Sequence, residues 1–193
     1  MNILVCVKQV PDTTAVKIDP VTNTLIRAGV PSILNPFDGF ALEMALQMKD
    51  KTGGTVTVMS MGPARAEDVL RESLSVGADE AYLVSGREFG GSDTLATSYI
   101  LSCAVKAVEE KRGEKFDVIY CGKQAIDGDT GQVGPEMAEH LGYTQITYAT
   151  ELVACEGDKV QVRKETADGY DVLEAALPVV ISVTKTPFEL RYP

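Results

Sequence analysis

The architecture of this chain is set by one turn, Cys121-Gly122-Lys123-Gln124-Ala125-Ile126-Asp127-Gly128-Asp129-Thr130-Gly131-Gln132-Val133-Gly134. The apolar run before it, Phe116 to Cys121, is typical of a buried strand. The apolar residues after it fall on one helical face: Val133, Met137, Ala138 and Leu141. A strand-to-helix turn with four glycines directs backbone N–H groups and a helix N-terminus toward the end of a parallel strand, where phosphate groups are bound.

We interpret this turn as a cradle for the phosphate or diphosphate of an adenine nucleotide. The turn contains neither G-x-G-x-x-G nor G-x-x-x-x-G-K-[ST], so neither common phosphate-loop pattern identifies it. A glycine- and aspartate-rich solvent loop is the alternative that the spacing leaves open.

Upstream of the turn, predicted strands and helices alternate. Apolar runs at residues 3–10, 55–61 and 81–84 predict buried strands of a parallel sheet. Helix starts are expected at Asn35-Pro36, with Asn35 as the N-cap, at Gly62-Pro63, and at Ser92 or Asp93. Residues 1–145 therefore predict an α/β core with parallel pairing and right-handed crossovers.

The turns that leave these strands share one rim of the sheet. They follow Val7, Met61, Val84 and Cys121. Ligands of open parallel sheets bind beyond the carboxyl ends of the strands, near the point where the strand order reverses. The rim is therefore the expected binding site.

Two further segments predict β-structure. Residues 16–27 suggest a small hairpin laid over the domain edge. Residues 146–193 change character: extended runs at 145–152, 159–166 and 170–177 are separated by turns that suit hairpins. Residues 178–183 then predict a final buried strand that returns to the sheet.

The composition excludes several classes of function. A net charge of −10 and a pI near 4.6 argue against nucleic acid and against an anionic membrane surface, because both need a clustered basic face. No segment approaches the roughly 20 apolar residues that span a bilayer. The N-terminus lacks a secretory pattern, so we expect a cytoplasmic chain.

The cysteines and the single histidine predict no metal centre. Cys6, Cys103, Cys121 and Cys155 form no C-x-x-C, and His140 has no cysteine at ligand spacing. We therefore expect no metal, no disulfide and no catalytic Cys–His pair.

The chain resembles the beta subunits of electron transfer flavoproteins. The motifs that carry the resemblance are the 122–134 block, Cys6-Val7-Lys8-Gln9-Val10, Asn35-Pro36-Phe37-Asp38, Met61-Gly62-Pro63, Val76-Gly77-Ala78-Asp79 and Leu190-Arg191-Tyr192-Pro193. The fold implied is a Rossmann-like α/β sheet with helices on both faces, of the adenine nucleotide alpha hydrolase-like type, with a C-terminal β-hairpin extension. The activity implied is electron transfer in a heterodimer with an alpha subunit that carries FAD, without catalytic residues of its own.

The resemblance implies partners and one bound adenine nucleotide. Electrons pass to or from acyl-CoA dehydrogenase-type flavoproteins. The nucleotide is AMP in ordinary members, whereas electron-bifurcating members hold a second FAD that NADH reduces. Residues 16–20, 25–27, 29–33 and 89–97 resemble the bifurcating and anaerobic type. A stand-alone domain that hydrolyses ATP is a third hypothesis, disfavoured because the chain has no phosphate-loop lysine motif.

The resemblance also implies which residues bind the cofactor. Cys6 offers backbone on the adenine side, Met61 contacts the adenosine, and Asn35, Pro36, Phe37 and Asp38 wall it. The residues expected around ribose and phosphate are Gly122, Lys123, Gln124, Ala125, Ile126, Asp127, Gly128, Asp129, Thr130, Gly131, Gln132 and Val133.

Three of these expectations carry a condition. Thr94 and Thr97 either contact a flavin or are ordinary threonines of a helix cap and a helix surface. Asp127 and Asp129 would repel a phosphate, so we expect them to cap turns or bond ribose hydroxyls. Gly128 is expected to adopt positive φ or to let the phosphate approach closely.

The sequence departs from the family at its end. Family members continue past Leu190-Arg191-Tyr192-Pro193 into a basic partner-recognition loop and a C-terminal arm that wraps the alpha subunit. We therefore expect residues 146–193 to be truncated before that arm, as a fragment or a short variant, which puts docking of dehydrogenases and stable pairing with alpha in question.

Overall fold

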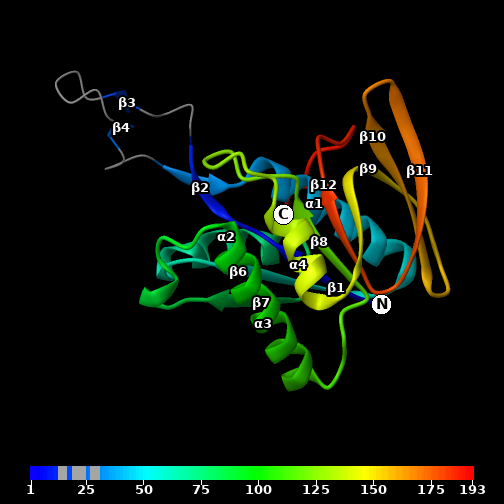
Figure 1. Ribbon diagram of the computed structural model, residues 1–193, viewed down its shortest axis with the longest axis horizontal. Coiled ribbons are helices and arrows are strands. Elements are labelled where there is room, and N and C mark those ends of the chain that lie inside the picture. Colours follow the sequence, from blue (N-terminus) through cyan, green and yellow to red (C-terminus); the bar gives the residue numbers. More distant parts are fainter. Residues whose placement is uncertain (13–16, 19–24, 27–30) are drawn as a thin grey trace.

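A computed structural model of the chain describes residues 1–12, 17–18, 25–26 and 31–193. Its centre is an eight-stranded sheet with the order β11-β10-β9-β12-β8-β1-β6-β7 (Figure 1). The sheet is parallel from β9 to β7 and antiparallel between β9, β10 and β11. Its strands are β1 (Asn2–Cys6), β6 (Thr55–Met61), β7 (Glu80–Val84), β8 (Val118–Gly122), β9 (Thr144–Glu156), β10 (Lys159–Thr166), β11 (Gly169–Ala176) and β12 (Val179–Val183).

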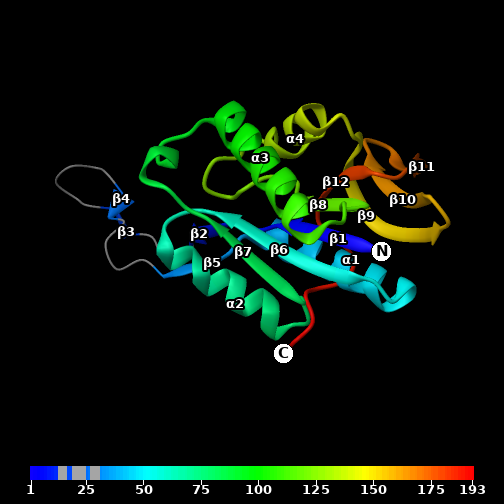
Figure 2. The ribbon, with the colours of Figure 1, turned by 90° about the horizontal axis from the view of Figure 1, so that it is seen from below.

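Helices cover both faces of this sheet, as the sequence predicts. Figure 2 shows α1 (Pro36–Thr52) and α2 (Glu67–Ser75) on one face, and α3 (Thr94–Arg112) and α4 (Val133–Leu141) on the other. Successive strand residues point to opposite faces, so Ile3 and Val5 join the core cluster on the α1 side, while Leu4 and Cys6 join the cluster under α3 and α4.

The helices begin near the residues that the sequence predicts, and the structure adds detail at two of these starts. The Asp93 carboxylate accepts a hydrogen bond from Ala96 N at 2.8 Å and caps α3. The helix expected at Gly62-Pro63 begins with a 3₁₀ turn, η2 (Ala64–Ala66), before α2. The loop between β7 and α3 contains a second 3₁₀ turn, η3 (Arg87–Phe89).

The first predicted strand is wrong in its length. Residues 3–10 form two strands, because β1 ends at Cys6 and β2 (Gln9–Pro11) leaves the sheet to pair antiparallel with β5 (Ser32–Leu34). The backbone of Lys8, between them, bonds α1 instead: its N–H donates to Asp38 Oδ2 at 2.8 Å, and its carbonyl accepts from Asn35 N at 2.9 Å. An apolar run alone does not reveal such a redirection.

Part of the hairpin expected at residues 16–27 is described. β3 (Lys17–Ile18) pairs antiparallel with β4 (Leu25–Ile26). Figure 1 shows the pair beyond the β2–β5 ribbon rather than over the domain edge. The remaining residues of that hairpin lie outside the described residues, and so do residues 16, 19, 20, 27, 29 and 30 of the segments that carried the resemblance to bifurcating members.

The C-terminal prediction is confirmed. β9, β10 and β11 form an antiparallel meander, and β12 returns to lie between β8 and β9, parallel to both. Because β12 lies inside the sheet, residues 146–193 and residues 1–145 share one sheet. After β12 the chain crosses α1, where the Arg191 guanidinium donates to the buried Glu43 carboxylate at 2.9 Å and to Asp50 at 2.9 Å. In the described residues, no helix has the length and apolar character needed to cross a membrane.

Gly122 and Gly128 give a matched test of this packing. A Cβ on Gly122 would lie 2.7 Å from the Phe37 carbonyl carbon and 2.8 Å from Asp38 N, whereas a Cβ on Gly128 meets nothing within 4 Å. We expect Gly122→Ala to lower the free energy of unfolding by about 1–3 kcal/mol, and Gly128→Ala to change it by less than about 0.5 kcal/mol. Urea denaturation of both variants measures this, and equal effects would contradict the packing.

Candidate functional site

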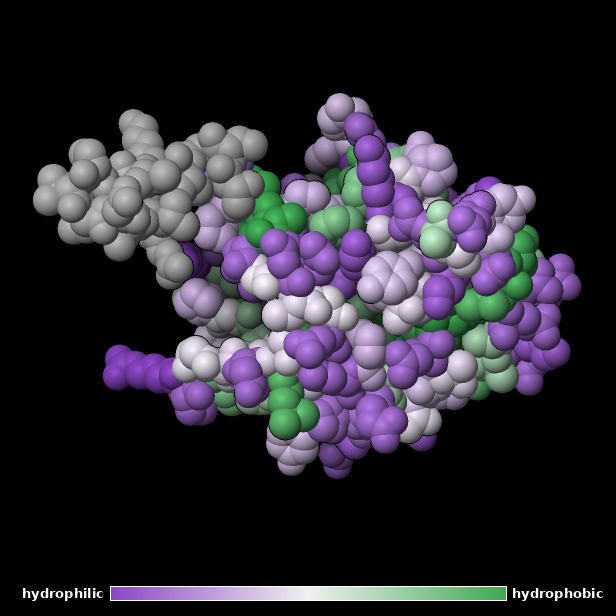
Figure 3. Space-filling model, turned by 45° about the horizontal axis from the view of Figure 1, so that its top comes forward, coloured by the Kyte–Doolittle hydropathy of each residue, from purple (hydrophilic) through white to green (hydrophobic). Residues whose placement is uncertain are grey.

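A cavity of about 630 Å³ opens at the carboxyl ends of β1, β6 and β8. The strand order reverses beside β1, where β6 and β7 lie on one side and β8 and β12 on the other. This is the topological switch point at which such sheets bind ligands, and the volume lies in the range of small-molecule sites. Figure 3 shows a recess on this face, with paler and green residues deeper than the purple residues around it.

The Asp38 carboxylate joins the two strands at the switch point. Its Oδ2 accepts from Lys8 N at 2.8 Å, just past β1, and its Oδ1 accepts from Gly122 N at 3.0 Å, at the end of β8. Asp38 is 5% exposed. Burial raises the pKa of Asp38 to about 7, although hydrogen bonds from Asn35, Lys8 and Gly122 and the Lys8 charge oppose that rise.

Asn35 holds the turn after β8 against the start of α1. Its Nδ2 donates to the Gln124 carbonyl at 2.9 Å, and its Oδ1 accepts from Ile126 N at 3.2 Å. Asn35 stands at the N-cap position, but its side chain makes no capping bond. The prediction of Asn35 as a capping residue is therefore wrong in its chemistry, because this 1% exposed amide bonds the distant turn instead.

The two aspartates of the turn are paired within the protein. Lys8 Nζ lies 2.8 Å from one Asp127 oxygen and 3.0 Å from the other. Asp129 Oδ1 accepts from Gln124 Nε2 at 2.8 Å, and Asp129, not Gly128, adopts a left-handed φ of 55°. Gly128 does not adopt positive φ, so of the two alternatives expected for it only close approach of the phosphate stays a prediction. Both carboxylates therefore interact with donors of the protein, and these interactions reduce the repulsion between the carboxylates and a bound anion.

Backbone donors of the same turn remain available. Within residues 31–193, the N–H groups of Thr130, Gly131, Gln132 and Val133 donate to no protein acceptor. Residues 130–132 precede α4, and Val133 is its first residue. The unbonded N–H groups at the start of a helix carry partial positive charge. All four residues line the cavity, so this end of it is suited to phosphate oxygens.

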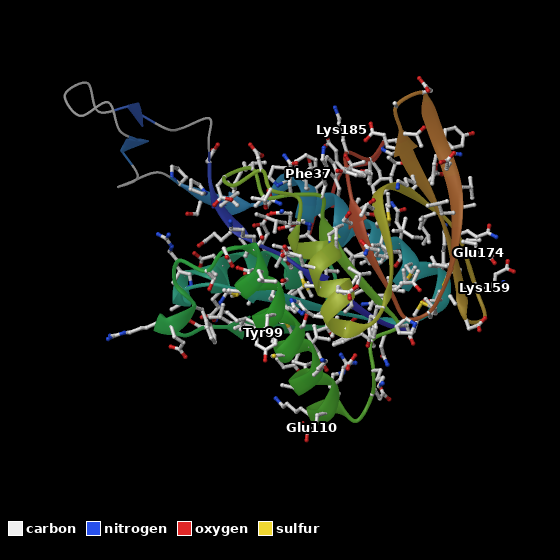
Figure 4. All side chains as sticks on the ribbon, viewed as in Figure 1. Phe37, Tyr99, Glu110, Lys159, Glu174 and Lys185 are labelled. Carbon is white, nitrogen blue, oxygen red and sulfur yellow. The ribbon has the colours of Figure 1, made fainter. Side chains whose placement is uncertain are left out.

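Lys123, which follows β8, also lines the cavity. Its N–H donates to the Val183 carbonyl at 2.7 Å, which ties the turn to β12. Its ammonium lies 5.9 Å from the Phe37 ring centroid and 5.3 Å from the Tyr148 ring centroid. The cation is thus held beside two aromatic rings. In the view of Figure 4, Phe37 and Lys185 are labelled on the same side of the molecule.

The loop before α3 contributes to the cavity wall. Gly91, Ser92 and Asp93 line the cavity together with Thr94 and Thr97. Thr94 Oγ1 lies 3.2 Å from Gln132 Oε1 and 3.2 Å from Glu136 Oε1, which connects α3 to α4. The Thr97 N–H donates to the Asp93 carbonyl at 3.0 Å, so Thr97 belongs to the first turn of α3.

The structure brings most of the predicted site residues to one cavity. Those that line it are Cys6, Asn35, Asp38, Met61, Thr94, Thr97, Gly122, Lys123, Gln124, Ala125, Gly128, Thr130, Gly131, Gln132 and Val133. Five others, Pro36, Phe37, Ile126, Asp127 and Asp129, lie beside it without lining it. Sequence reasoning missed Val7, Lys8, Met59, Phe89, Gly91, Ser92, Asp93, Leu101, Cys121 and Gly134. Several of these follow the strand ends, so the shared rim was the signal that could have found them.

The cavity floor is apolar and rich in sulfur. Cys6, Met59 and Cys121 line it between the strand ends, and all four cysteines of the chain are free. The described residues contain no group of three or more His, Cys, Asp or Glu side chains that could hold a metal ion. An apolar floor, available amides and a glycine-lined turn together fit the base, sugar and phosphate of a nucleotide.

Known proteins match this chain along nearly its whole length. The electron transfer flavoprotein domain model matches residues 22–192. An electron transfer flavoprotein subunit beta of Megasphaera elsdenii is 59% identical over 195 residues, which cover 100% of this chain and 72% of the relative. The caffeyl-CoA reductase-Etf complex subunit CarD of Acetobacterium woodii is 52% identical, covering 100% of this chain and 71% of CarD. Protein FixA of Azotobacter vinelandii is 50% identical, covering 100% and 68%.

Asp38 should make the stability of the nucleotide-free chain depend on pH. Its pKa of about 7 in the folded state lies above that of an unfolded aspartate, near 3.9, so the folded chain retains a proton that the unfolded chain releases. The stabilisation is therefore present at low pH and is lost as the pH rises through about 7, with a slope of at most about 1.4 kcal/mol per pH unit.

Asp38→Asn removes this titration. We expect the difference in unfolding free energy between the native chain and the variant to be larger at pH 5.5 than at pH 8, as measured by urea denaturation. A difference that stays constant across that range would contradict the raised pKa.

Proposed function

This chain belongs to the electron transfer flavoprotein family as a beta subunit, and we propose that its cavity binds an adenine nucleotide in a heterodimer with an alpha subunit. The observation that carries the proposal is the position of the available N–H groups of residues 130–133. These residues line a cavity at the switch point of the sheet, which Lys123 and the apolar Met59, Cys6 and Cys121 also line. Phosphate oxygens fit the amide end, and the base fits the floor.

The protein groups have distinct tasks in this proposal. Asp38 and Asn35 hold the ends of β1, α1 and β8 together, so the turn keeps its shape. The Lys8 ammonium offsets the charge of Asp127, which lowers the repulsion that a phosphate meets, and Gln124 holds Asp129 by a hydrogen bond. Lys123 and the amides then supply the positive end of the site. No residue of this chain needs to exchange a proton with a substrate.

We propose FAD as the nucleotide, with AMP as the alternative. Phe89, Thr94 and Thr97 also line the cavity, and they offer further wall for a group larger than adenosine. AMP would leave that wall without a contact. When bound, FAD supplies one- and two-electron chemistry that the side chains lack.

The partners proposed for the complex are the alpha subunit, an acyl-CoA dehydrogenase-type flavoprotein and, for the FAD form, NADH as the reductant. The relative CarD is named as a subunit of a reductase–Etf complex, which supports a place beside a CoA-linked reductase. With FAD on this chain, the complex would be of the electron-bifurcating type.

Counting flavins decides between the two nucleotides. We expect the heterodimer purified with an alpha subunit to release two FAD molecules per pair, measured by mass spectrometry of the small molecules and by the visible absorbance of the native complex. One FAD together with one AMP would support the AMP form. Release of neither nucleotide from this chain would contradict the proposal.

Gly128 tests the phosphate end without disturbing the fold. A Cβ there meets no protein atom within 4 Å, yet the residue lines the cavity. We expect Gly128→Val to weaken AMP binding at least about 10-fold, or 1.4 kcal/mol, and Gly128→Ala to weaken it less, with both variants as stable as the native chain. Calorimetric titration with AMP measures the affinities. Unchanged affinity in Gly128→Val would place the phosphate elsewhere.

A further inference from the structure

Three sulfur side chains stand abreast on three adjacent strands. Cys6 of β1 lies directly opposite Met59 of β6 on one side and Cys121 of β8 on the other. Residues in register on parallel strands point to the same face, and all three belong to the cluster under α3 and α4. We call Met59, Cys6 and Cys121 the sulfur row. It lines the floor of the cavity.

We propose that the sulfur row binds a soft monovalent metal ion, Cu(I) or Ag(I). Thiolate and thioether ligands select soft ions, whereas carboxylate and carbonyl oxygens suit hard ones. The row supplies two thiols and one thioether, and no group of three or more His, Cys, Asp or Glu side chains adds to it in the described part of the chain. A soft ion of low coordination number therefore fits better than zinc, which takes four ligands.

The spacing of the strands is compatible with one shared ion. Neighbouring strands lie about 4.8 Å apart, and a metal–thiolate bond is about 2.3 Å long. An ion between β1 and β8 can therefore contact the sulfur atoms of Cys6 and Cys121 after side-chain rotation, while Met59, one strand farther on, reaches it only through its longer and more flexible side chain. Cys121 Sγ has a weak partner to give up, the Ile181 carbonyl at 3.9 Å. The cavity provides the path by which the ion enters.

The protonation of the two thiols shapes how the ion binds. Burial raises the pKa of Cys6 to about 12, and burial together with the neighbouring Cys6 raises the pKa of Cys121 well above its ordinary value. Both thiols are therefore protonated at neutral pH and are poor nucleophiles. Each thiol that ligates the ion loses its S–H proton to solvent and forms a metal–sulfur bond, with no change in oxidation state. Affinity should consequently rise with pH.

Occupancy of the sulfur row has a consequence for the cavity. An ion there would sit where the proposed nucleotide places its base, so metal and nucleotide should exclude each other. This consequence rests on the proposed function, whereas binding of the ion to the nucleotide-free chain does not. The two ideas can therefore fail separately.

The test uses the full chain with its other cysteines replaced. Cys103→Ser and Cys155→Ser together remove the exposed thiol on α3 and the thiol that lies 3.6 Å from Met1 Sδ, a second sulfur pair. This background, freed of nucleotide and kept reduced under anaerobic conditions, is titrated with Cu(I) against a chromophoric Cu(I) chelator. We expect one Cu(I) per chain, with proton release measured in weakly buffered solution.

Substitutions within the sulfur row supply the decisive comparison. We expect Cys6→Ser or Cys121→Ser to weaken Cu(I) binding at least about 100-fold, and Met59→Leu about 10-fold, because thiolate is the stronger ligand. Circular dichroism and the unfolding midpoint check that each variant is folded. Unchanged Cu(I) affinity in folded Cys6→Ser and Cys121→Ser, or no binding to the background chain, would overturn the proposal.

A competition with AMP separates the two proposals. We expect AMP to raise the Cu(I) concentration needed for half-saturation in the background chain. If Cu(I) binds to the sulfur row and AMP, shown by calorimetry to bind, does not compete, then the metal site stands and the base is placed elsewhere. Loss of Cu(I) binding alongside normal AMP binding would overturn the metal site alone.

Discussion

The structure depends on one buried carboxylate that accepts two backbone N–H groups from different strands. Asp38 stands in the first turn of α1 and bonds Lys8 N and Gly122 N, so it joins the end of β1 to the end of β8. These strands flank the point where the strand order reverses. A parallel sheet tends to open there, because the connections on the two sides leave in opposite directions. Asp38 bridges the opening while the cavity above it stays available.

The turn after β8 is organised by the same neighbourhood. Asn35 bonds the turn at Gln124 and Ile126, and Gly122 permits the close approach of α1 that Asp38 requires. With its first half held in this way, the second half of the turn, residues 130–133, lines the cavity with N–H groups that donate to no protein acceptor. Both aspartates of the turn also have protein partners: Asp127 pairs with the Lys8 ammonium, and Asp129 accepts a hydrogen bond from Gln124.

The last part of the chain completes the sheet rather than forming a separate unit. β12 lies between β8 and β9, and Lys123 N donates to the Val183 carbonyl at its end. The turn of the site is thus supported from both sides, by α1 through Asn35 and by β12 through the backbone. Arg191 holds the segment after β12 on α1 by its bonds to Glu43 and Asp50, which keeps that helix covered on its outer side.

Local chemistry in the sequence determined the alternation of strands and helices, a helix start at Ser92 or Asp93, and the meander at residues 144–176. It also determined the rim on which the site lies. Hydrophobic periodicity, turn residues and helix caps each depend on a few neighbouring residues. Only the tertiary structure decided what the polar residues of the rim do. Asn35 looks like a capping residue in its own segment, yet it bonds a turn about 90 positions away in the chain. The break after Cys6, the pairing of Asp127 with Lys8 and the alignment of Met59, Cys6 and Cys121 likewise depend on which strands become neighbours. Strand order and register are products of packing between distant segments, and no local pattern carries that information.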